Sequence, residues 1–148
     1  MALSSNEKRK YAITPFVSSA TLTSASTDIL GTLTNAQTIY TAPATGARIY
    51  SLIASTDDTA AVNVRFYIKS SGGNARPIAN VNIPLGSGDT ASKLMVDCLN
   101  PLVAVGLPID ENGKRYIEMG NGDLLVAHTI VAMTAAKNCF ITAMGADY

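Results

Sequence analysis

Hydrophobic and polar residues alternate over residues 61–69 of this chain, which read AVNVRFYIK. The apolar set takes every second position and comprises Val62, Val64, Phe66 and Ile68. The intervening positions hold Asn63, Arg65, Tyr67 and Lys69. A period of two with β-branched and aromatic residues is typical of a half-buried strand. We therefore expect the apolar set to face a core and the intervening set to face solvent.

Other strand-like stretches follow at intervals of roughly eight to twelve residues, with turn residues between them. They comprise residues 38–41, 48–55, 78–85, 115–119, 124–133 and 138–144. In the third stretch, the predicted inward set is Ala79, Val81, Ile83 and Leu85. Pro84 places that strand at a sheet edge or ends it. Asn112-Gly113 predicts a type I′ hairpin turn, because both central residues of that turn need positive φ. The last two stretches are expected to pair with each other.

Residues 90–109 are open to two interpretations. Ser92 could cap a short helix that continues to Leu99. Alternatively, Leu94, Val96 and Cys98 could form one face of a strand. The pattern of residues does not decide between the two.

The first part of the chain, residues 1–37, has no firm period and consists largely of Ser, Thr and Ala after a short basic cluster. We interpret it as an extended arm that packs on its own domain or adds a strand to a neighbouring molecule. Short strands are expected within it at residues 17–22 and 28–33. The alternative is a frayed terminus. An ordered arm is favoured by its apolar residues, which include Phe16, Ile29 and Leu30.

These stretches predict an all-β protein with a single folded domain. Residues 38–148 are expected to form an antiparallel β-sandwich, jelly-roll-like and of about eight strands, with residues 1–37 as its extended N-terminal arm. A chain of 148 residues is long enough to bury a sizeable core.

Charge is low and balanced in this chain. Eleven basic residues match eleven acidic ones, and charged residues make up 15% of the sequence, where about a quarter is usual. A neutral chain has no field that would attract nucleic acid, so we expect no nucleic-acid partner. No apolar run reaches the length of a membrane span, so we expect no membrane partner. Low charge also suggests that part of the surface contacts other protein, although an ordinary globule of low charge is the alternative.

Candidate catalytic groups are few. His128 is the only histidine, and it shares a strand face with Val126 and Ile130, which favours a hydrogen-bonded structural residue or an interface contact. Cys98 and Cys139 are too few for a disulfide framework. We expect two reduced, buried thiols, as in a protein made in a reducing cytosol. No catalytic residue is predicted, and the chain is not expected to be an enzyme.

Metal and cofactor signals are equally weak. Asp57-Asp58 and Asp110-x-Asn112 offer oxygen ligands that would suit calcium, but turns select these residues for backbone reasons. The sequence contains no phosphate-binding or dinucleotide-binding glycine motif and no Cys-x-x-Cys pair. We therefore predict no metal site and no cofactor.

Most of residues 38–148 resembles the small β-sandwich proteins of tailed-phage particles. The resembling pieces are IYTAPATGARIYSLIAST, AVNVRFYI, SSGG, VNIPLGSGDT, MGNGDLLVAHTI and CFITAMGADY. Residues 90–109 depart from this pattern and look like an insertion. Within the group, a free-standing domain with a polar arm is similar to capsid cement or decoration proteins.

The resemblance implies a virion protein made in the cytoplasm of a bacterial host. It would sit on the exterior of the phage head as a homo-oligomer, expected to be a trimer, and stabilise contacts between subunits of the major capsid protein. The arm would supply capsid or subunit contacts. The residues expected to make them are Lys8, Arg9, Lys10, Phe16, Ile29 and Leu30.

The alternative is a tail or host-recognition module that contacts a cell-surface glycan through loops 70–74 and 110–113. Sugar sites usually present aromatic platforms. The chain has no Trp, and none of its six Tyr falls in these two loops. This distribution disfavours the glycan-binding alternative.

Overall fold

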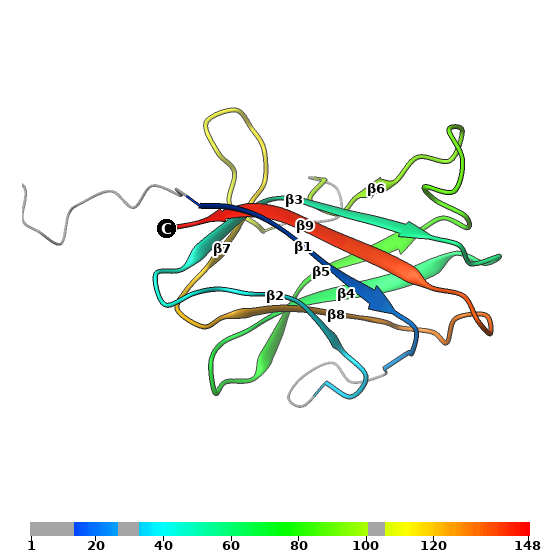
Figure 1. Ribbon diagram of the computed structural model, residues 1–148, viewed down its shortest axis with the longest axis horizontal. Helices are drawn as coiled ribbons and strands as arrows, with labels where there is room; N and C mark the ends of the chain where they lie inside the picture. Colours follow the sequence, from blue (N-terminus) through cyan, green and yellow to red (C-terminus); the bar gives the residue numbers. More distant parts are fainter. Residues whose placement is uncertain (1–13, 27–32, 101–105) are drawn as a thin grey trace, which may run out of the picture.

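The protein is a two-layer β-sandwich (Figure 1). A computed structural model describes residues 14–26, 33–100 and 106–148. These residues form nine strands, and no helix occurs among them. The predicted all-β antiparallel sandwich is confirmed.

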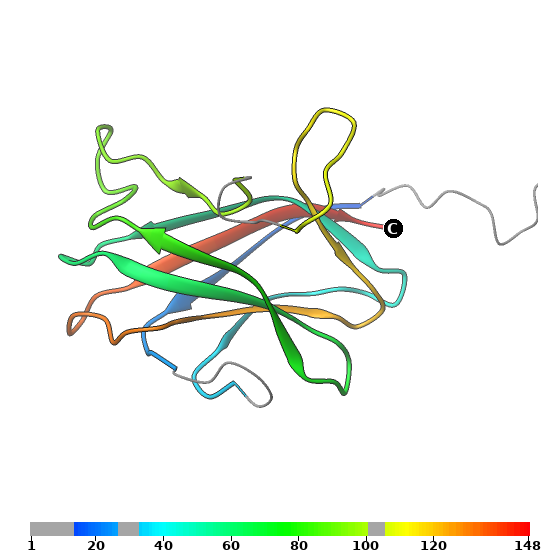
Figure 2. The same cartoon turned by 180° about the vertical axis from the view of Figure 1, so that it is seen from behind.

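Each layer is an antiparallel sheet. The first, sheet A, contains β1 (Thr14–Leu22), β9 (Cys139–Asp147), β3 (Ala47–Thr56) and β6 (Val96–Asp97) in that order, with β7 (Ile117–Met119) also paired to β3. The second, sheet B, contains β2 (Gln37–Thr41), β8 (Leu124–Thr129), β4 (Val62–Lys69) and β5 (Ala75–Ile83) in that order. Figure 2 shows sheet B from its own side, with β4 and β5 in front.

The connectivity is that of a jelly roll, as expected. β1 pairs with β9, β2 with β8, β3 with β6 and β7, and β4 with β5. The first strand thus pairs with the last and the second with the next to last, and this nested pairing continues inward to β4 and β5, as in a jelly roll. Since β6 and β7 both pair with β3 on the side away from β9, they share one strand position, and the nine strands fill eight positions.

The core lies between the sheets, and β4 contributes to it as its alternation predicts. Val64 and Phe66 are fully buried, and Val62 is nearly so. Val64 is opposite Val81 of β5, and Val62 is opposite Ile83. Burying each large apolar side chain contributes about 1.5–3 kcal/mol. The inner face of β4 is therefore a main source of stability.

Tyr67 differs from its prediction. It is completely buried, although it lies on the polar face of β4. The register between β4 and β5 shifts between Phe66 and Tyr67, and Tyr67 packs with Ala75 and Val126 beneath Leu33. A second, small apolar cluster therefore covers part of the outer face of sheet B. Period alone could not predict it, because the covering residue comes from a distant segment.

The expected pairing of the last two strands is wrong. β8 lies in sheet B and β9 in sheet A, so the connection between them crosses from one layer to the other. Two acidic residues hold this connection: Asp57 accepts from the backbone N–H of Asn138, and Asp58 accepts from Thr134. A short connection is compatible with either a hairpin or a crossing, and these contacts fix the crossing.

Two further predictions need correction. Leu85 is about half exposed rather than inward, because β5 ends at Ile83, immediately before Pro84. The Asn112-Gly113 turn forms, and the Gly113 N–H donates to Asp110 O. Only Gly113 has positive φ, however, at 77°, so the turn is not type I′.

Of the two interpretations of residues 90–109, the strand is the closer one. β6 is a two-residue strand, and Cys98 beyond it is buried, but Leu94 is 77% exposed and lies outside the strand. The described residues of this stretch, 90–100 and 106–109, contain no helix.

The residues expected to form the arm include a strand of the sandwich. β1 pairs with β9 along its whole length, from Thr14 opposite Asp147 to Leu22 opposite Cys139. The short strand expected at 17–22 is therefore present and longer than predicted. The strand expected at 28–33 lies mostly outside the described residues.

Acid sensitivity is expected from Asp58, which is buried (3% exposed). It accepts from the Thr134 hydroxyl at 2.5 Å, the Thr134 N–H at 2.9 Å and the Ala60 N–H at 3.1 Å. These donors, chiefly the Thr134 hydroxyl, hold the pKa of Asp58 below its ordinary 3.8. The contribution of ionised Asp58 to folding stability is complete above its unfolded-state pKa and is lost as pH falls through its folded-state pKa.

The corresponding experiment compares urea midpoints at pH 7 and pH 3. We expect Asp58→Asn to lower the midpoint at pH 7 and to lose stability less steeply on acidification than the parent chain. Asp89→Asn, in an exposed turn, is the matched control and should behave like the parent. An unchanged pH dependence in Asp58→Asn would contradict the assignment.

Candidate binding surfaces

Most of the outer face of sheet A is uncharged on its three longest strands, β1, β3 and β9, and Arg48 near the start of β3 is the exception. Alternation places these side chains outward, because the residues between them, such as Leu52, Ala54 and Ile141, are buried. We call this surface the uncharged face. It comprises Val17, Ser19 and Thr21 of β1, Phe140, Thr142 and Met144 of β9, and Ser51, Ile53 and Ser55 of β3.

The register brings these nine side chains into three rows. Val17 is opposite Met144, which is opposite Ser51, and the other two rows follow at two-residue steps. Two large apolar side chains are exposed on it: Val17 at 72% and Phe140 at 42%. The outer face of sheet B is different, since it presents Arg65 and Lys69 of β4.

Polar groups mark one end of the uncharged face. Arg48 Nε donates to Glu118 Oε2 at 2.8 Å, and the guanidinium lies 4.3 Å from the centre of the Tyr116 ring. The Tyr148 hydroxyl also donates to Glu118. Burial, helped by this hydrogen bond and by the charge of Glu118, raises the pKa of Tyr148 to about 12. An exposed ion pair of this kind contributes little to stability.

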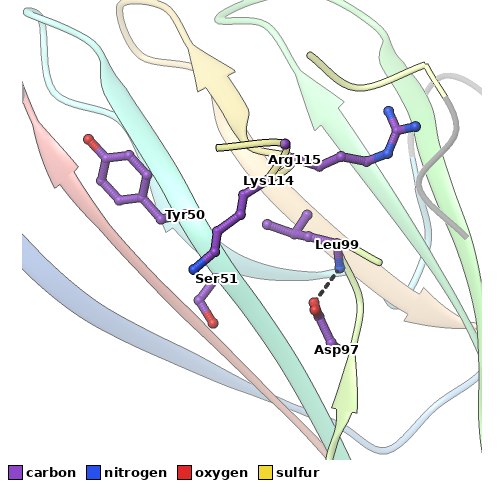
Figure 3. Close-up of a pocket in the computed structure, with 7 residues that line it drawn as sticks. Tyr50, Ser51, Asp97, Leu99, Lys114 and Arg115 are labelled. Carbon is purple, nitrogen blue, oxygen red and sulfur yellow. Dashed lines mark hydrogen bonds between the residues drawn. The ribbon is translucent and has the colours of Figure 1, made fainter. Parts of the chain in front are cut away.

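A groove of about 320 Å³ opens beside the uncharged face, between β3, β6 and the turn around Gly113 (Figure 3). The residues that line it are Tyr50, Ser51, Asp97, Leu99, Gly113, Lys114 and Arg115. Lys114 reaches toward Ser51, whereas the guanidinium of Arg115 points away from Tyr50 and Lys114 (Figure 3). Arg115 Nη1 donates to the Leu107 carbonyl at 2.6 Å.

The groove contains one of the two loops expected to contact sugars, 110–113, through Gly113. The other loop, 70–74, connects β4 to β5 in sheet B. Tyr50 supplies an aromatic ring that the loops themselves lack. The positions of the aromatic residues along the sequence do not reveal this ring, because Tyr50 lies on a strand that is far from both loops along the chain.

Only one of the residues expected to make arm contacts lies in a described segment. Phe16 of β1 stacks on Tyr40 of β2, with ring centres 3.8 Å apart. The Tyr40 hydroxyl donates to Asp147 of β9. Burial, this hydrogen bond and the charge of Asp147 raise the pKa of Tyr40 above its ordinary value. Phe16 thus joins the two sheets within the chain. Lys8, Arg9, Lys10, Ile29 and Leu30 lie outside the described residues.

His128 is buried and hydrogen-bonded through both ring nitrogens. Nδ1 lies 2.9 Å from the Thr129 carbonyl oxygen, and Nε2 lies 2.9 Å from the Tyr67 hydroxyl. Since the carbonyl can only accept, neutral His128 carries its hydrogen on Nδ1 and accepts from Tyr67. The Ser26 N–H donates to the same carbonyl oxygen. This network fastens residues 25 and 26 to β8 and leaves no ring nitrogen facing solvent.

The two cysteines are free and buried. Burial raises the pKa of the Cys139 thiol to about 12 and also raises that of Cys98. Because the thiolate is the reactive form, we expect neither thiol of the native protein to react with iodoacetamide at pH 8. In urea, above the unfolding midpoint, both should react rapidly. Rapid labelling of either cysteine in native protein, located by peptide mass analysis, would contradict this prediction.

Within residues 14–26, 33–100 and 106–148, no group of three acidic, histidine or cysteine side chains is arranged to hold a metal ion. The same residues contain no helix that is long and apolar enough to span a membrane. Searches of protein-family models, curated proteins and solved structures found no match to this chain.

Proposed function

We propose that this protein is a structural protein of a tailed-phage particle: a capsid cement or decoration protein that binds the outside of the head. In this role it acts by binding alone, as a homo-oligomer expected to be a trimer, and stabilises contacts between subunits of the major capsid protein. The observation that carries the proposal is the uncharged face of sheet A. The resemblance of residues 38–148 to phage β-sandwich proteins supplies the type of partner.

The uncharged face can be buried at low cost. Charged groups are expensive to desolvate, and none of the nine side chains is charged. Val17 and Phe140, which are 72% and 42% exposed, would gain about 25 cal/mol for each Å² of apolar surface removed from water. A surface of this composition favours protein contact over permanent exposure to solvent.

The size of the face limits what it can do alone. Three strands spaced about 4.8 Å apart, with three rows about 7 Å apart, cover roughly 300 Å². A stable interface buries roughly 800 Å² on each partner. The uncharged face would therefore form the centre of a contact whose rim comes from neighbouring segments. An oligomer that makes several such contacts at once gains avidity from high effective concentration.

The remaining features are compatible with a particle-bound role. A sandwich with a closed apolar core is rigid, as a clamp between shell subunits must be. The buried, free thiols of Cys98 and Cys139 suit synthesis in the reducing cytoplasm of a bacterial host. The balanced charge gives the chain no general attraction for packaged DNA.

The test places a charge on the uncharged face. Phe140→Asp should weaken binding to heads of the encoding phage by roughly tenfold or more, since burying an unpaired carboxylate costs more than 1.4 kcal/mol. Co-sedimentation of protein with stripped heads measures this binding, and sedimentation velocity measures the oligomer separately. Asn80→Asp, on the outer face of sheet B, is the matched control and should bind normally.

A parent protein that stays monomeric and does not sediment with heads would end the proposal. If Phe140→Asp and Asn80→Asp bound heads equally well, the protein would still bind the capsid, but the uncharged face would not be the surface that makes the contact. A portal or major capsid gene beside the gene for this chain would be an independent supporting observation.

A further inference from the structure

The groove beside β3 has walls that are fixed before any ligand arrives. The backbone N–H of Leu99 donates to Asp97 Oδ1 at 2.9 Å, which holds the carboxylate (Figure 3). On the opposite wall, Asp110 Oδ1 accepts from the N–H of Lys114 at 2.8 Å, and the N–H of Asp110 donates to the Lys114 carbonyl at 2.8 Å. These bonds hold the Asp97 carboxylate and the backbone at Lys114 in place before binding, so both lose little entropy on binding, which favours affinity.

The third wall is a bulge in β3. The register between β3 and β9 shifts between Ile49 and Ser51, which leaves Tyr50 without a partner in β9. Bulges redirect a side chain and are enriched next to functional sites. The Tyr50 side chain is 49% exposed and lies beside the groove (Figure 3).

Three charged residues line the groove: Asp97, Lys114 and Arg115. The Arg115 guanidinium points away from Tyr50 and Lys114 (Figure 3) and donates to the Leu107 carbonyl, so Asp97 and Lys114 are the opposite charges left for a ligand. The ion pair found within the described segments joins Arg48 to Glu118, so Asp97 and Lys114 do not pair with each other. Asp97 would repel an anionic ligand, and Lys114 would repel a cationic one. An uncharged ligand that both donates and accepts hydrogen bonds can bind to Asp97 and to Lys114 without repulsion from either.

We propose that this groove binds a neutral pyranose saccharide. Ring hydroxyls would donate to Asp97 and accept from Lys114, and the apolar face of the sugar ring would lie against the Tyr50 ring. The volume of about 320 Å³ is at the small end of ligand sites, so it suits one or two sugar units. The inference goes beyond capsid binding and does not depend on it, since none of the three proposed sugar contacts, Tyr50, Asp97 and Lys114, is among the nine side chains of the uncharged face.

The experiment is a titration of the full 148-residue chain followed by ¹H–¹⁵N correlation spectra. The probes are glucose, galactose and N-acetylglucosamine, with glucuronic acid as an anionic sugar and sorbitol as an acyclic polyol. We expect saturable shifts at the amides of Ser51, Gly113 and Lys114 with at least one neutral pyranose. Sorbitol should cause none, because it has no ring face to stack on Tyr50.

Variants separate the proposed contacts from general effects. Tyr50→Ala should weaken the binding by roughly tenfold, whereas Tyr50→Phe, which keeps the ring, should stay within about threefold of the parent. Lys114→Met should weaken it as well. Phe140→Ala lies at the far end of the uncharged face and should leave sugar binding unchanged, so it separates this site from the proposed capsid contact.

Several results would overturn the inference. They are the absence of saturable shifts with all three neutral sugars, equal shifts with sorbitol, and undiminished binding by Tyr50→Ala in a variant whose remaining spectrum is native. Binding of glucuronic acid alone would also overturn it, since it would assign the groove to anions.

Discussion

Val64→Asp is expected to destabilise the domain by roughly 4 kcal/mol or more, which places it among the most damaging single substitutions. Val64 is fully buried on the inner face of β4, opposite Val81. An ionised carboxylate there would lose its hydration without gaining a partner. Natural domains have only about 5–15 kcal/mol of total stability, so a loss of about 4 kcal/mol removes between roughly a quarter and four-fifths of it. Urea unfolding followed by circular dichroism measures the loss.

The damage should be pH-dependent with a defined sign. Burial disfavours the charged form, so the pKa of the new carboxyl group is raised in the folded state. Stability is then regained as pH falls through the folded-state pKa toward the lower unfolded-state pKa, because the neutral acid is less costly to bury. The control is Asn63→Asp, which adds the same carboxylate one residue earlier on the outer face and should cost less than about 0.5 kcal/mol. Equal stability of the two variants would contradict the assigned facing of β4.

The inner strands could be predicted from the sequence because their side chains alternate strongly. In β4 and β5 the buried positions of the main core are Val, Ile or Phe, and the positions between them are mostly polar, so a period of two is visible. Pro84 marks the end of β5, since proline cannot donate to a sheet ladder. These signals are local and need no knowledge of the partner strand.

The sequence of β1 predicts part of an arm rather than a sheet strand, because the same contrast between apolar and polar positions is missing. Its outward positions include Val17, and its inward positions include Ser18, whose hydroxyl donates to the Ile39 carbonyl at 2.6 Å. An inward serine satisfied by the other sheet and an outward valine erase the alternation. The uncharged outward residues of β1 that weaken its alternation are also the residues that it contributes to the uncharged face.

The pairing of strands and the set of residues around the groove depend on the tertiary structure, so local sequence patterns could not predict them. Side-chain periodicity indicates which face a strand buries, but not which strand lies beside it, so the crossing between β8 and β9 is not visible in the sequence. Tyr50, Asp97 and Lys114 come from three separate segments, and only the jelly-roll connectivity places them around one groove. Tyr67 was missed for a similar reason, because its cover comes from residues near Leu33.

Gly145→Ala is the second substitution expected to have a large effect. Gly145 lies in the middle of sheet A, opposite Phe16 of β1 and Ile49 of β3. A Cβ atom there would lie 2.2 Å from the Arg48 carbonyl oxygen and 2.7 Å from Cζ of Phe16. The first contact is with backbone, so the clash can be relieved only if β3 and β9 move apart. A glycine inside a strand often marks such a close backbone approach.

Overpacking of this kind costs about 3 kcal/mol, which corresponds to a fall in Tm of roughly 6–12 °C for a domain of this size. Differential scanning calorimetry measures it. Gly73→Ala is the matched control, because Gly73 lies in the turn between β4 and β5, and its added Cβ would have its nearest contact at 3.4 Å, with Ser70 Cβ. That variant should stay within about 0.5 kcal/mol of the parent. Equal Tm values for Gly145→Ala and Gly73→Ala would contradict the close packing of β3 and β9 at Gly145.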